Sequence, residues 1–290
     1  GIILRTRPKQ SAHAYQKIWT DEGSPLLIHS KKLTQKLRES LDENYVVALG
    51  MRYANPSIES VITPLLECDS IHIIPLFPQY STATTQSAIE KAQKELKKKN
   101  HNGRLIITQD FYNHPAFING LAQTIIENKQ EDAHLLFSYH GLPVKQINKT
   151  ARCKNVCNRQ DACPNVSADN HNCYRAQCYA TTEGVAKTLG IDISNYSVSF
   201  QSRLGKLPWI QPYTTDMLDV LAKKGIKKLD VVCPSFFVDC LETLEEIGIQ
   251  AKEQWVESGG TDLRLIPCLN DHPHAVKTLT QLIKDKQITT

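Results

Sequence analysis

The stretch that decides the fold reads Leu135-Leu136-Phe137-Ser138-Tyr139-His140-Gly141-Leu142-Pro143. Residues 133–137 have the length and apolar composition of a buried strand, and Gly141 and Pro143 prevent it from continuing. We therefore expect His140 at the carboxyl edge of this strand, which is where open parallel sheets bind ligands. A histidine there is a candidate for proton transfer, although a structural role is commoner for an isolated histidine.

Segments that favour strands alternate with segments that favour helices on both sides of this stretch. Further strands are expected at residues 45–50, 70–75, 104–108, 196–200, 228–233 and 263–267. Helices are expected at residues 26–41, from Asn55-Pro56 onward, at 81–99, 115–128, up to Leu189, at 214–224, at 239–247 and after Pro273. Such alternation predicts βαβ units and parallel sheets.

The number of these units predicts an α/β protein of two Rossmann-like halves, each a parallel sheet flanked by helices. The first half is expected to span residues 1–130 and the second residues 131–270, with a cysteine-rich insertion at residues 150–178. Neither half carries a glycine-rich dinucleotide fingerprint or a P-loop, so the sequence predicts no nucleotide site.

The composition is that of a globular protein with a substantial core. The chain has 290 residues and 41% of them are apolar, so it needs no disulfide scaffold. The net charge of +4 is too small to indicate nucleic acid, but it is compatible with an acidic ligand or an anionic membrane surface. No apolar run is long enough to span a membrane and no secretory signal is visible, which favours a cytoplasmic protein.

Five of the nine cysteines lie close together in the sequence. They are Cys153, Cys157, Cys163, Cys173 and Cys178. Thiolates interleaved with asparagine, aspartate and lysine are typical of a site for a soft metal or an iron–sulfur cluster, and not of a core. The other four cysteines stand in apolar contexts and are expected to be core residues.

Three further segments place unusual residues just beyond predicted strands, at residues 50–53, 75–81 and 233–242. In parallel sheets these ends meet in one cleft with His140. Glu242 and Glu246 are four residues apart, which puts both carboxylates on one helix face, although acidic residues near a helix start are also common without a function. A histidine facing two carboxylates across an apolar cleft suits proton removal from a flat, weakly acidic ligand, followed by delivery of a metal.

Several motifs resemble those of ferrochelatases, and the resemblance extends over almost the whole chain. The motifs are Trp19-Thr20-Asp21-Glu22-Gly23-Ser24-Pro25, Gly50-Met51-Arg52-Tyr53, Pro78-Gln79-Tyr80-Ser81, Ser138-Tyr139-His140-Gly141-Leu142-Pro143, Phe200-Gln201-Ser202-Arg203-Leu204-Gly205-Lys206-Leu207-Pro208-Trp209 and Cys233-Pro234 through Leu241-Glu242-Thr243-Leu244-Glu245-Glu246. The resemblance, which is closest to bacterial protoporphyrin enzymes, implies two Rossmann-like domains without a nucleotide. It also implies that the terminal helix, residues 271–290, packs back on the first domain.

The resemblance implies that the chain inserts Fe²⁺ into protoporphyrin IX to form haem, with release of two protons, as the last step of haem biosynthesis. It implies that His140 and Glu242 are the essential residues and handle the substrate iron, with Glu246 one turn further along the same acidic path. The side from which iron enters is left open. The residues expected to line the porphyrin pocket are Arg52, Tyr53, Phe77, Tyr80 and Trp209.

Some ferrochelatases hold a [2Fe-2S] cluster, so the resemblance implies one here. The expected ligands are Cys153, Cys157, Cys163 and Cys173. A zinc ion on four thiolates and unbound thiols are the alternatives. The resemblance further implies residues before Gly1 that carry a first strand and one lip of the cleft, and a chain without them is expected to expose a strand edge.

Expected partners besides the porphyrin are the cytoplasmic face of the inner membrane, as a peripheral contact, and a second copy of the chain in a homodimer. Nucleic acid is not expected as a partner. Two alternatives to this enzyme stay open. One is a non-catalytic porphyrin-binding or iron–sulfur sensor protein on the same fold, and the other is a chelatase for another divalent metal.

Overall fold

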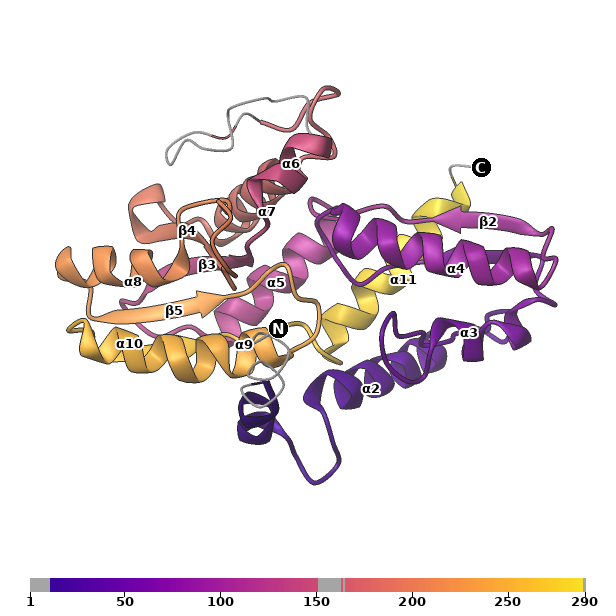
Figure 1. Cartoon of the computed structure of the whole chain (residues 1–290), viewed down its shortest axis with the longest axis horizontal. Helices are drawn as coiled ribbons and strands as arrows, with labels where there is room; N and C mark the ends of the chain where they lie inside the picture. The colour runs from indigo at the N-terminus through magenta and orange to yellow at the C-terminus, as the bar shows by residue number, and fades with distance from the viewer. Residues whose placement is uncertain (1–10, 151–162, 164, 289–290) are drawn as a thin grey trace.

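The computed structural model describes residues 11–150, 163 and 165–288. A four-stranded parallel sheet dominates the second half of the chain (Figure 1). Its strands are β3 (His134–His140), β4 (Tyr196–Gln201), β5 (Lys228–Val232) and β6 (Asp262–Leu265), in the order β4-β3-β5-β6. The chain passes from β3 to β4 on one side and then to β5 on the other, so β3 and β5 flank a topological switch point. Ligands of open α/β sheets bind at the carboxyl ends beside such a point.

Helices cover both faces of this sheet. They are α6 (Val144–Thr150), α7 (Tyr174–Leu189), α8 (Thr214–Lys223), α9 (Leu241–Leu244) and α10 (Lys252–Glu257), with a 3₁₀ turn η3 (Ile193–Asn195) and a π-helical segment η4 (Glu246–Ala251). Successive side chains of β3 alternate between two cores. Phe137 and Tyr139 pack with α7, whereas Leu136 packs with α8 and α10. Burial on both faces explains why the strand reads as a continuous apolar run.

The first half contains a smaller, two-stranded parallel sheet of β1 (Ser70–Ile73) and β2 (Arg104–Ile107). Its helices are α2 (Pro25–Ser40), α3 (Ile58–Val61), η1 (Thr63–Leu65), η2 (Thr82–Gln86), α4 (Ser87–Lys98) and α5 (Pro115–Asn128). Ile89, Ala92 and Leu96 form the apolar part of the buried face of α4. The parallel sheets flanked by helices confirm the predicted α/β class, while the domain boundary near residue 130 stays a prediction.

Two predicted elements of the first half are wrong. Residues 45–50 form no strand in the described part of the chain. The Arg38 guanidinium donates two hydrogen bonds, of 2.9 and 2.7 Å, to the Val47 carbonyl, so that acceptor is satisfied by a side chain and not by a neighbouring strand. The helix expected from Asn55 begins only at Ile58, because Ser57 caps it by accepting a bond from the Ser60 N–H.

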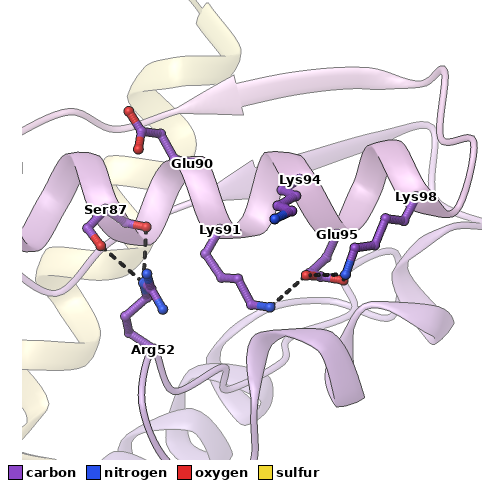
Figure 2. A pocket seen from close by; sticks show the side chains of 7 residues that line it. All are labelled: Arg52, Ser87, Glu90, Lys91, Lys94, Glu95 and Lys98. Atoms are coloured by element: carbon purple, nitrogen blue, oxygen red, sulfur yellow. Dashed lines mark hydrogen bonds and ion pairs between the residues drawn. The ribbon is translucent and has the colours of Figure 1, made fainter.

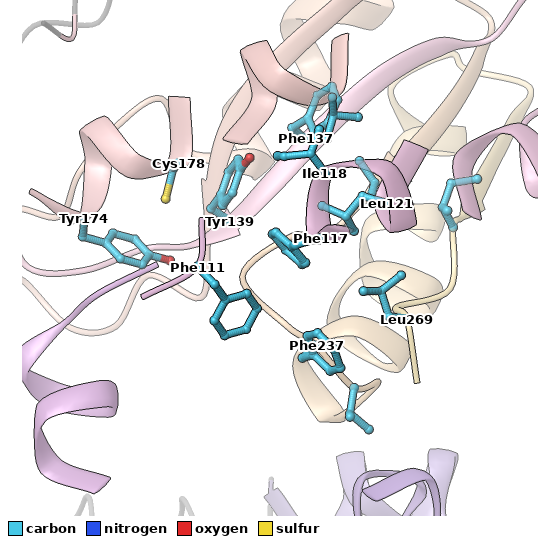
Figure 3. Close-up of a cluster of buried hydrophobic side chains, with 14 of the residues drawn as sticks. Phe111, Phe117, Ile118, Leu121, Phe137, Tyr139, Tyr174, Cys178, Phe237 and Leu269 are labelled. Atoms are coloured by element: carbon cyan, nitrogen blue, oxygen red, sulfur yellow. The ribbon is translucent and has the colours of Figure 1, made fainter. Parts of the chain in front are cut away.

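An aromatic cluster lies where the two halves meet (Figure 3). Phe111, which follows β2, stands edge-on to Phe117 of α5 and to Phe237 after β5, with ring centroids 5.3 and 5.9 Å apart. Such edge-to-face pairs add about 0.5–1.5 kcal/mol each beyond the area they bury. Because Phe237 is anchored in this cluster, the loop that precedes it is held close to the end of β3.

The last helix, α11 (Pro273–Ile288), contacts α5 and α2. It packs along α5 in Figure 1. Gly120 of α5 makes this approach possible, since a Cβ there would lie 3.3 Å from the Cβ of His274. The carboxyl-terminal end of the chain thus reaches the helices of the first half.

Candidate active site

His140 is the last residue of β3, so it lies at the carboxyl end of the strand and still belongs to it. Its backbone N–H donates to the Ser235 hydroxyl at 2.9 Å, and its carbonyl accepts from the Tyr174 hydroxyl at 2.8 Å. Ser235 follows β5, so the two sides of the switch point are bonded together at this residue. The main chain of His140 is therefore fixed from two other elements.

The imidazole of His140 is oriented by its own neighbour. Its Nδ1 lies 2.6 Å from the Gly141 carbonyl oxygen. A carbonyl only accepts hydrogen bonds, so Nδ1 carries the proton and Nε2 is the proton acceptor of the neutral ring. The ring therefore presents a base, which is half-buried at the sheet edge.

Gly141 is required by a close approach of two strands. Its N–H donates to the Gln201 carbonyl at 2.8 Å, and a Cβ added at Gly141 would lie 2.8 Å from that same oxygen. Real side chains do not tolerate this contact with backbone. The glycine thus allows β3 and β4 to remain paired up to His140 and Gln201.

Two aromatic side chains stand beside His140, and one of them was predicted. Trp209 has its ring centroid 6.3 Å from that of His140, and Phe236 lies at 6.1 Å. Tyr80 is only 7% exposed, and its hydroxyl bonds Gln86. Phe77 is half-buried. The aromatic rings that lie beside His140 are those of Trp209 and Phe236.

Glu246 is held at the end of β4 by three donors. Ser202 donates its N–H at 2.7 Å and its hydroxyl at 2.5 Å, and the Gln201 amide donates at 3.3 Å. Ser202 has φ of 65°, a left-handed conformation that costs about 1 kcal/mol for a residue with a side chain. The two bonds to Glu246 offset that cost, and strained residues of this kind cluster at functional sites.

Gln201 connects the histidine with the carboxylates. It pairs with His140 across the two strands, and its amide also donates to the Glu242 carbonyl at 2.6 Å. The structure thus brings His140 and the segment of Glu242 and Glu246 to one sheet edge, as the sequence predicts. Glu242 and Glu246 are both half-buried.

The helix that carries these glutamates is not regular. The α-helical turn α9 ends at Leu244 and the wider π-helical η4 follows, so the simple four-residue stacking expected from the sequence does not apply. Glu245 points elsewhere, since it is buried and bonded to Lys17 at 3.0 Å and to Gln250 at 2.6 Å. The Glu245 carboxylate is therefore engaged in structural contacts.

Cys240 and Tyr15 surround Glu242. Burial, reinforced by the Glu242 carboxylate, raises the pKa of the Cys240 thiol well above its usual value. The pKa of the Tyr15 hydroxyl is raised by burial and then by Glu242. The Cys240 thiol and the Tyr15 hydroxyl therefore both stay protonated beside Glu242 at neutral pH.

Arg52 and Tyr53 lie at a different place. The Arg52 guanidinium donates to the Ser87 carbonyl and hydroxyl at 3.2 and 3.1 Å and stacks on the Tyr53 ring at 4.5 Å. Tyr53 is 83% exposed, so it is open to a ligand. Figure 2 shows the basic cleft beside the contact of Arg52 with Ser87. This cleft of about 370 Å³ is lined by Arg52, Ser87, Glu90, Lys91, Lys94, Glu95 and Lys98.

The cysteine-rich segment is described in part. Cys153 and Cys157 lie outside the described residues. Cys173 is buried at the cap of α7, Cys178 is buried within that helix, and Cys163 is half-buried. The pKa of Cys178 is raised well above its usual value, by burial first and also by the nearby thiols of Cys173 and Cys163. Cys163 packs against the same hydrophobic core that contains Cys173 and Cys178.

Sequence reasoning gave no individual role to several residues that position the site, although four of them lie in segments that it had singled out. They are Tyr174, Gln201, Ser202, Ser235 and Phe236. Gln201 and Ser202 stand directly after a predicted strand, so the sequence places them at the sheet edge and could have indicated their role there. Tyr174 and Ser235 act through single hydroxyl contacts with the His140 main chain, which no periodicity reports.

Comparison with known proteins decides the family. The profile described as Ferrochelatase matches residues 1–287. The chain belongs to the ferrochelatase family. A ferrochelatase from Coxiella burnetii is 49% identical over 286 residues, covering 97% of this chain and 80% of that protein. A ferrochelatase from Legionella pneumophila is 47% identical over 285 residues, covering 98% of this chain and 85% of that protein.

Two solved structures share the fold of this chain. SirB from Bacillus subtilis with Fe³⁺ superposes with a TM-score of 0.57 at 12% identity, over 91% of this chain and 92% of that one. CbiX, the terminal enzyme for biosynthesis of sirohaem in denitrifying bacteria, gives 0.50 at 12% identity, over 90% of each chain. Among the helices that the structure describes, none is both long and apolar enough to cross a membrane.

Proposed function

We propose that this chain inserts Fe²⁺ into protoporphyrin IX with release of two protons, and that His140 and the glutamates at the edge of β4 carry the reaction. The supporting observation is that Gln201 bonds the strand of His140 on one side and the helix of Glu242 and Glu246 on the other. Membership of the ferrochelatase family supplies the substrate class. Iron and porphyrin are both substrates here.

His140 removes protons from the porphyrin. Pyrrole N–H groups are too weakly acidic to ionise unaided, so a base must stand close to them. The Gly141 carbonyl holds the proton on Nδ1, which leaves Nε2 to accept one from the ring. A second, sequential role of Nε2 as a ligand of the entering iron uses the same lone pair once the proton has passed on.

Glu242 and Glu246 handle the protons that leave the porphyrin and the iron that enters it. Two released protons need acceptors near the sheet edge, and an entering divalent cation needs negative charge there. Glu246 has fixed donors on both carboxylate oxygens, so it suits a relay for protons or a fixed counter-charge. Glu242 interacts with the Cys240 thiol, which is only a weak donor, so Glu242 suits movement with the metal.

The porphyrin ring is held by aromatic and basic groups. Trp209 and Phe236 flank His140 and give the macrocycle an apolar wall. Arg52, stacked on the exposed Tyr53, offers a cation to a carboxylate on the ring periphery. Binding energy from the periphery can then bend the ring and expose its nitrogen lone pairs to the iron. Phe77 and Tyr80 are also proposed to line the porphyrin pocket.

A [2Fe-2S] cluster on Cys153, Cys157, Cys163 and Cys173 is proposed as a resident group. The chemistry of the donor set fits, because thiolates are the usual ligands of such clusters. Such a cluster would supply a structural or sensing function, since metallation with Fe²⁺ needs no electrons. Visible absorption and about two irons per chain in anaerobically purified protein support it. A colourless protein that contains zinc, or no metal, overturns it.

Attachment to the membrane surface is proposed through the loop after β4. Leu204 and Leu207 are 52% and 63% exposed and flank Lys206. Apolar tips beside a cation suit the interface of an anionic bilayer. Co-sedimentation with anionic vesicles should fall when both leucines are replaced by serine. A cytoplasmic location and a homodimer stay predictions.

The test of the proposed function is haem formation from Fe²⁺ and protoporphyrin IX under anaerobic conditions. The full-length chain should form haem at a rate well above that of the solution reaction, and faster than it inserts Co²⁺ or Ni²⁺. Binding of the porphyrin without metallation would instead support a binding or sensor protein. Faster insertion of another divalent metal would support the second alternative.

A further inference from the structure

A group of metal-binding side chains lies away from the sheet edge, where α5 ends and α11 begins. Its members are Glu127, His272 and His274, and one ligand atom from each can be chosen so that all lie within 4.8 Å of one another. The two imidazole rings have centroids 4.8 Å apart. None of these residues belongs to the site around His140 or to the cysteine-rich segment.

The spacing within this group suits a shared cation better than direct hydrogen bonds. Nε2 of His272 lies 3.6 Å from Oε2 of Glu127, and Nε2 of His274 lies 3.6 Å from the other carboxylate oxygen, Oε1. Hydrogen bonds between such atoms are about 2.7–3.2 Å long. Two ligands on one tetrahedral ion, each at about 2.1 Å, are separated by about 3.4 Å, which is close to the observed distance.

The backbone on both sides of the group is well anchored. Glu127 stands in the last turn of α5, which packs along α11. The turn before α11 is tied down because Asn270 and Cys268 both bond Asp239, at 2.6 and 3.2 Å. The first turn of α11 is further held by Thr278, which donates to the His274 carbonyl at 2.8 Å. The three ligands therefore need only side-chain rotation to meet.

One weak contact must be given up on metal binding. The His274 N–H lies 3.5 Å from Nδ1 of His272, at the outer limit of a hydrogen bond. Coordination through Nε2 requires Nδ1 to carry the proton, so this contact is lost. Its length means that the loss is small compared with a metal–imidazole bond.

We propose that Glu127, His272 and His274 form a binding site for a divalent transition metal, of the Zn²⁺ class, that clamps the start of α11 to the end of α5. Imidazole nitrogen with one carboxylate selects such metals over Mg²⁺, which prefers oxygen ligands. Three protein ligands leave a position for water, so the metal is exchangeable. At the opposite end of this antiparallel helix pair, His114 bonds Asp285 at 2.9 Å, so the metal would supply the second tie.

Hydrogen exchange of the full-length chain tests this proposal with a local readout. Zn²⁺ compared with a chelator should slow amide exchange in residues 274–279 by at least tenfold, while Mg²⁺ should have no effect. His272→Asn with His274→Gln should remove the slowing, and Asn can still cap the helix. The control His13→Ala removes an exposed histidine elsewhere and should keep it.

Other zinc sites do not confuse this measurement, because the exchange is followed at the start of α11. Haem formation by the double variant should stay within about twofold of the parent, which reports that the fold is intact. Glu127→Gln is the second variant and should weaken the apparent Zn²⁺ affinity at this site about tenfold. Equal slowing in the parent and the double variant, or equal slowing by Mg²⁺ and Zn²⁺, overturns the proposal.

Discussion

The edge of the four-stranded sheet and the basic cleft beside α4 hold their polar groups in different ways. At the sheet edge, His140 is fixed through its own main chain, by Ser235 and Tyr174. In the cleft, Arg52 is held through its side chain, by Ser87 and an exposed Tyr53 ring. Main-chain anchoring leaves less freedom than contacts of a long side chain.

This difference separates two kinds of task. Proton transfer requires a base placed to within a fraction of an ångström, so it belongs where strands pair and glycine permits close packing. Recognition of a carboxylate at the rim of a large ligand tolerates adjustment, and a cation on a long stem suits it. Changes at the sheet edge should therefore lower kcat, and changes in the cleft should raise KM.

The largest effect is expected from His140→Ala. Loss of a general base lowers the rate by about 10²–10⁴-fold, so haem formation should nearly vanish while porphyrin binding, measured by fluorescence quenching, remains. His134→Gln is a matched control at the other end of β3, where the ring bonds Ser197 at 2.9 Å. Near-normal activity of His140→Ala would remove the sheet edge from the chemistry.

Gly141→Ala should be next. The added Cβ meets the Gln201 carbonyl, so β3 and β4 must separate at their ends. We expect a loss of about 1–3 kcal/mol in the free energy of unfolding and a fall of kcat on the order of 10²-fold, through displacement of His140. Chemical denaturation and steady-state kinetics measure the two. Gly190→Ala is a control, because an alanine in the left-handed conformation of Gly190 is strained but has open space around it at the end of α7. This variant should lose stability and keep the kcat of the parent.

Ser202→Ala sharpens the assignment of Glu246. The variant loses a hydrogen bond to a carboxylate and keeps the left-handed backbone, so it should cost about 1–2 kcal/mol of stability. Ser202→Gly loses the same hydroxyl without the strain and should be about 1 kcal/mol more stable than the alanine variant. Similar losses of kcat in both would tie activity to the hydroxyl, whereas normal kcat in both would make Glu246 a structural residue.

Arg52→Ala tests the other side of the comparison. Loss of one charge contact with the porphyrin should raise KM for it by up to about tenfold, with kcat nearly unchanged. Lys97→Ala, on the exposed side of α4, is a charge-matched control outside the lining of the cleft. A fall in kcat with unchanged KM would place Arg52 in the chemistry and abolish the distinction between the two regions.

The strands of the large sheet and the edge position of His140 were predictable because buried parallel strands are short apolar runs with abrupt ends. The extended segment at residues 45–50 looks equally strand-like, but a ladder needs a partner, and sequence periodicity cannot report one. The π-helical turn after Leu244 and the contacts of Ser235 with His140 depend on tertiary packing. Glu242 and Glu246 could thus be named from sequence, but their different surroundings could not.

The smallest predicted effect concerns Asp230 of β5, which bonds Gln130 in the segment that leads from α5 to β3. Its carboxylate accepts from the Gln130 N–H at 2.7 Å and from the Gln130 amide at 3.1 Å. Burial raises the pKa of Asp230 above its usual value, and these bonds only partly counter it. A raised carboxyl pKa means that protonation favours the folded state, so the contribution of Asp230 is greatest below its unfolded pKa and is lost as pH rises through the folded pKa. The free energy of unfolding of the parent should therefore improve relative to Asp230→Asn as the pH is lowered from 7 to about 4. Urea denaturation measures the free energy of unfolding of both proteins across this pH range. If their difference does not change with pH, Asp230 is not held in an unfavourable ionised state, and its contact with Gln130 adds no pH dependence.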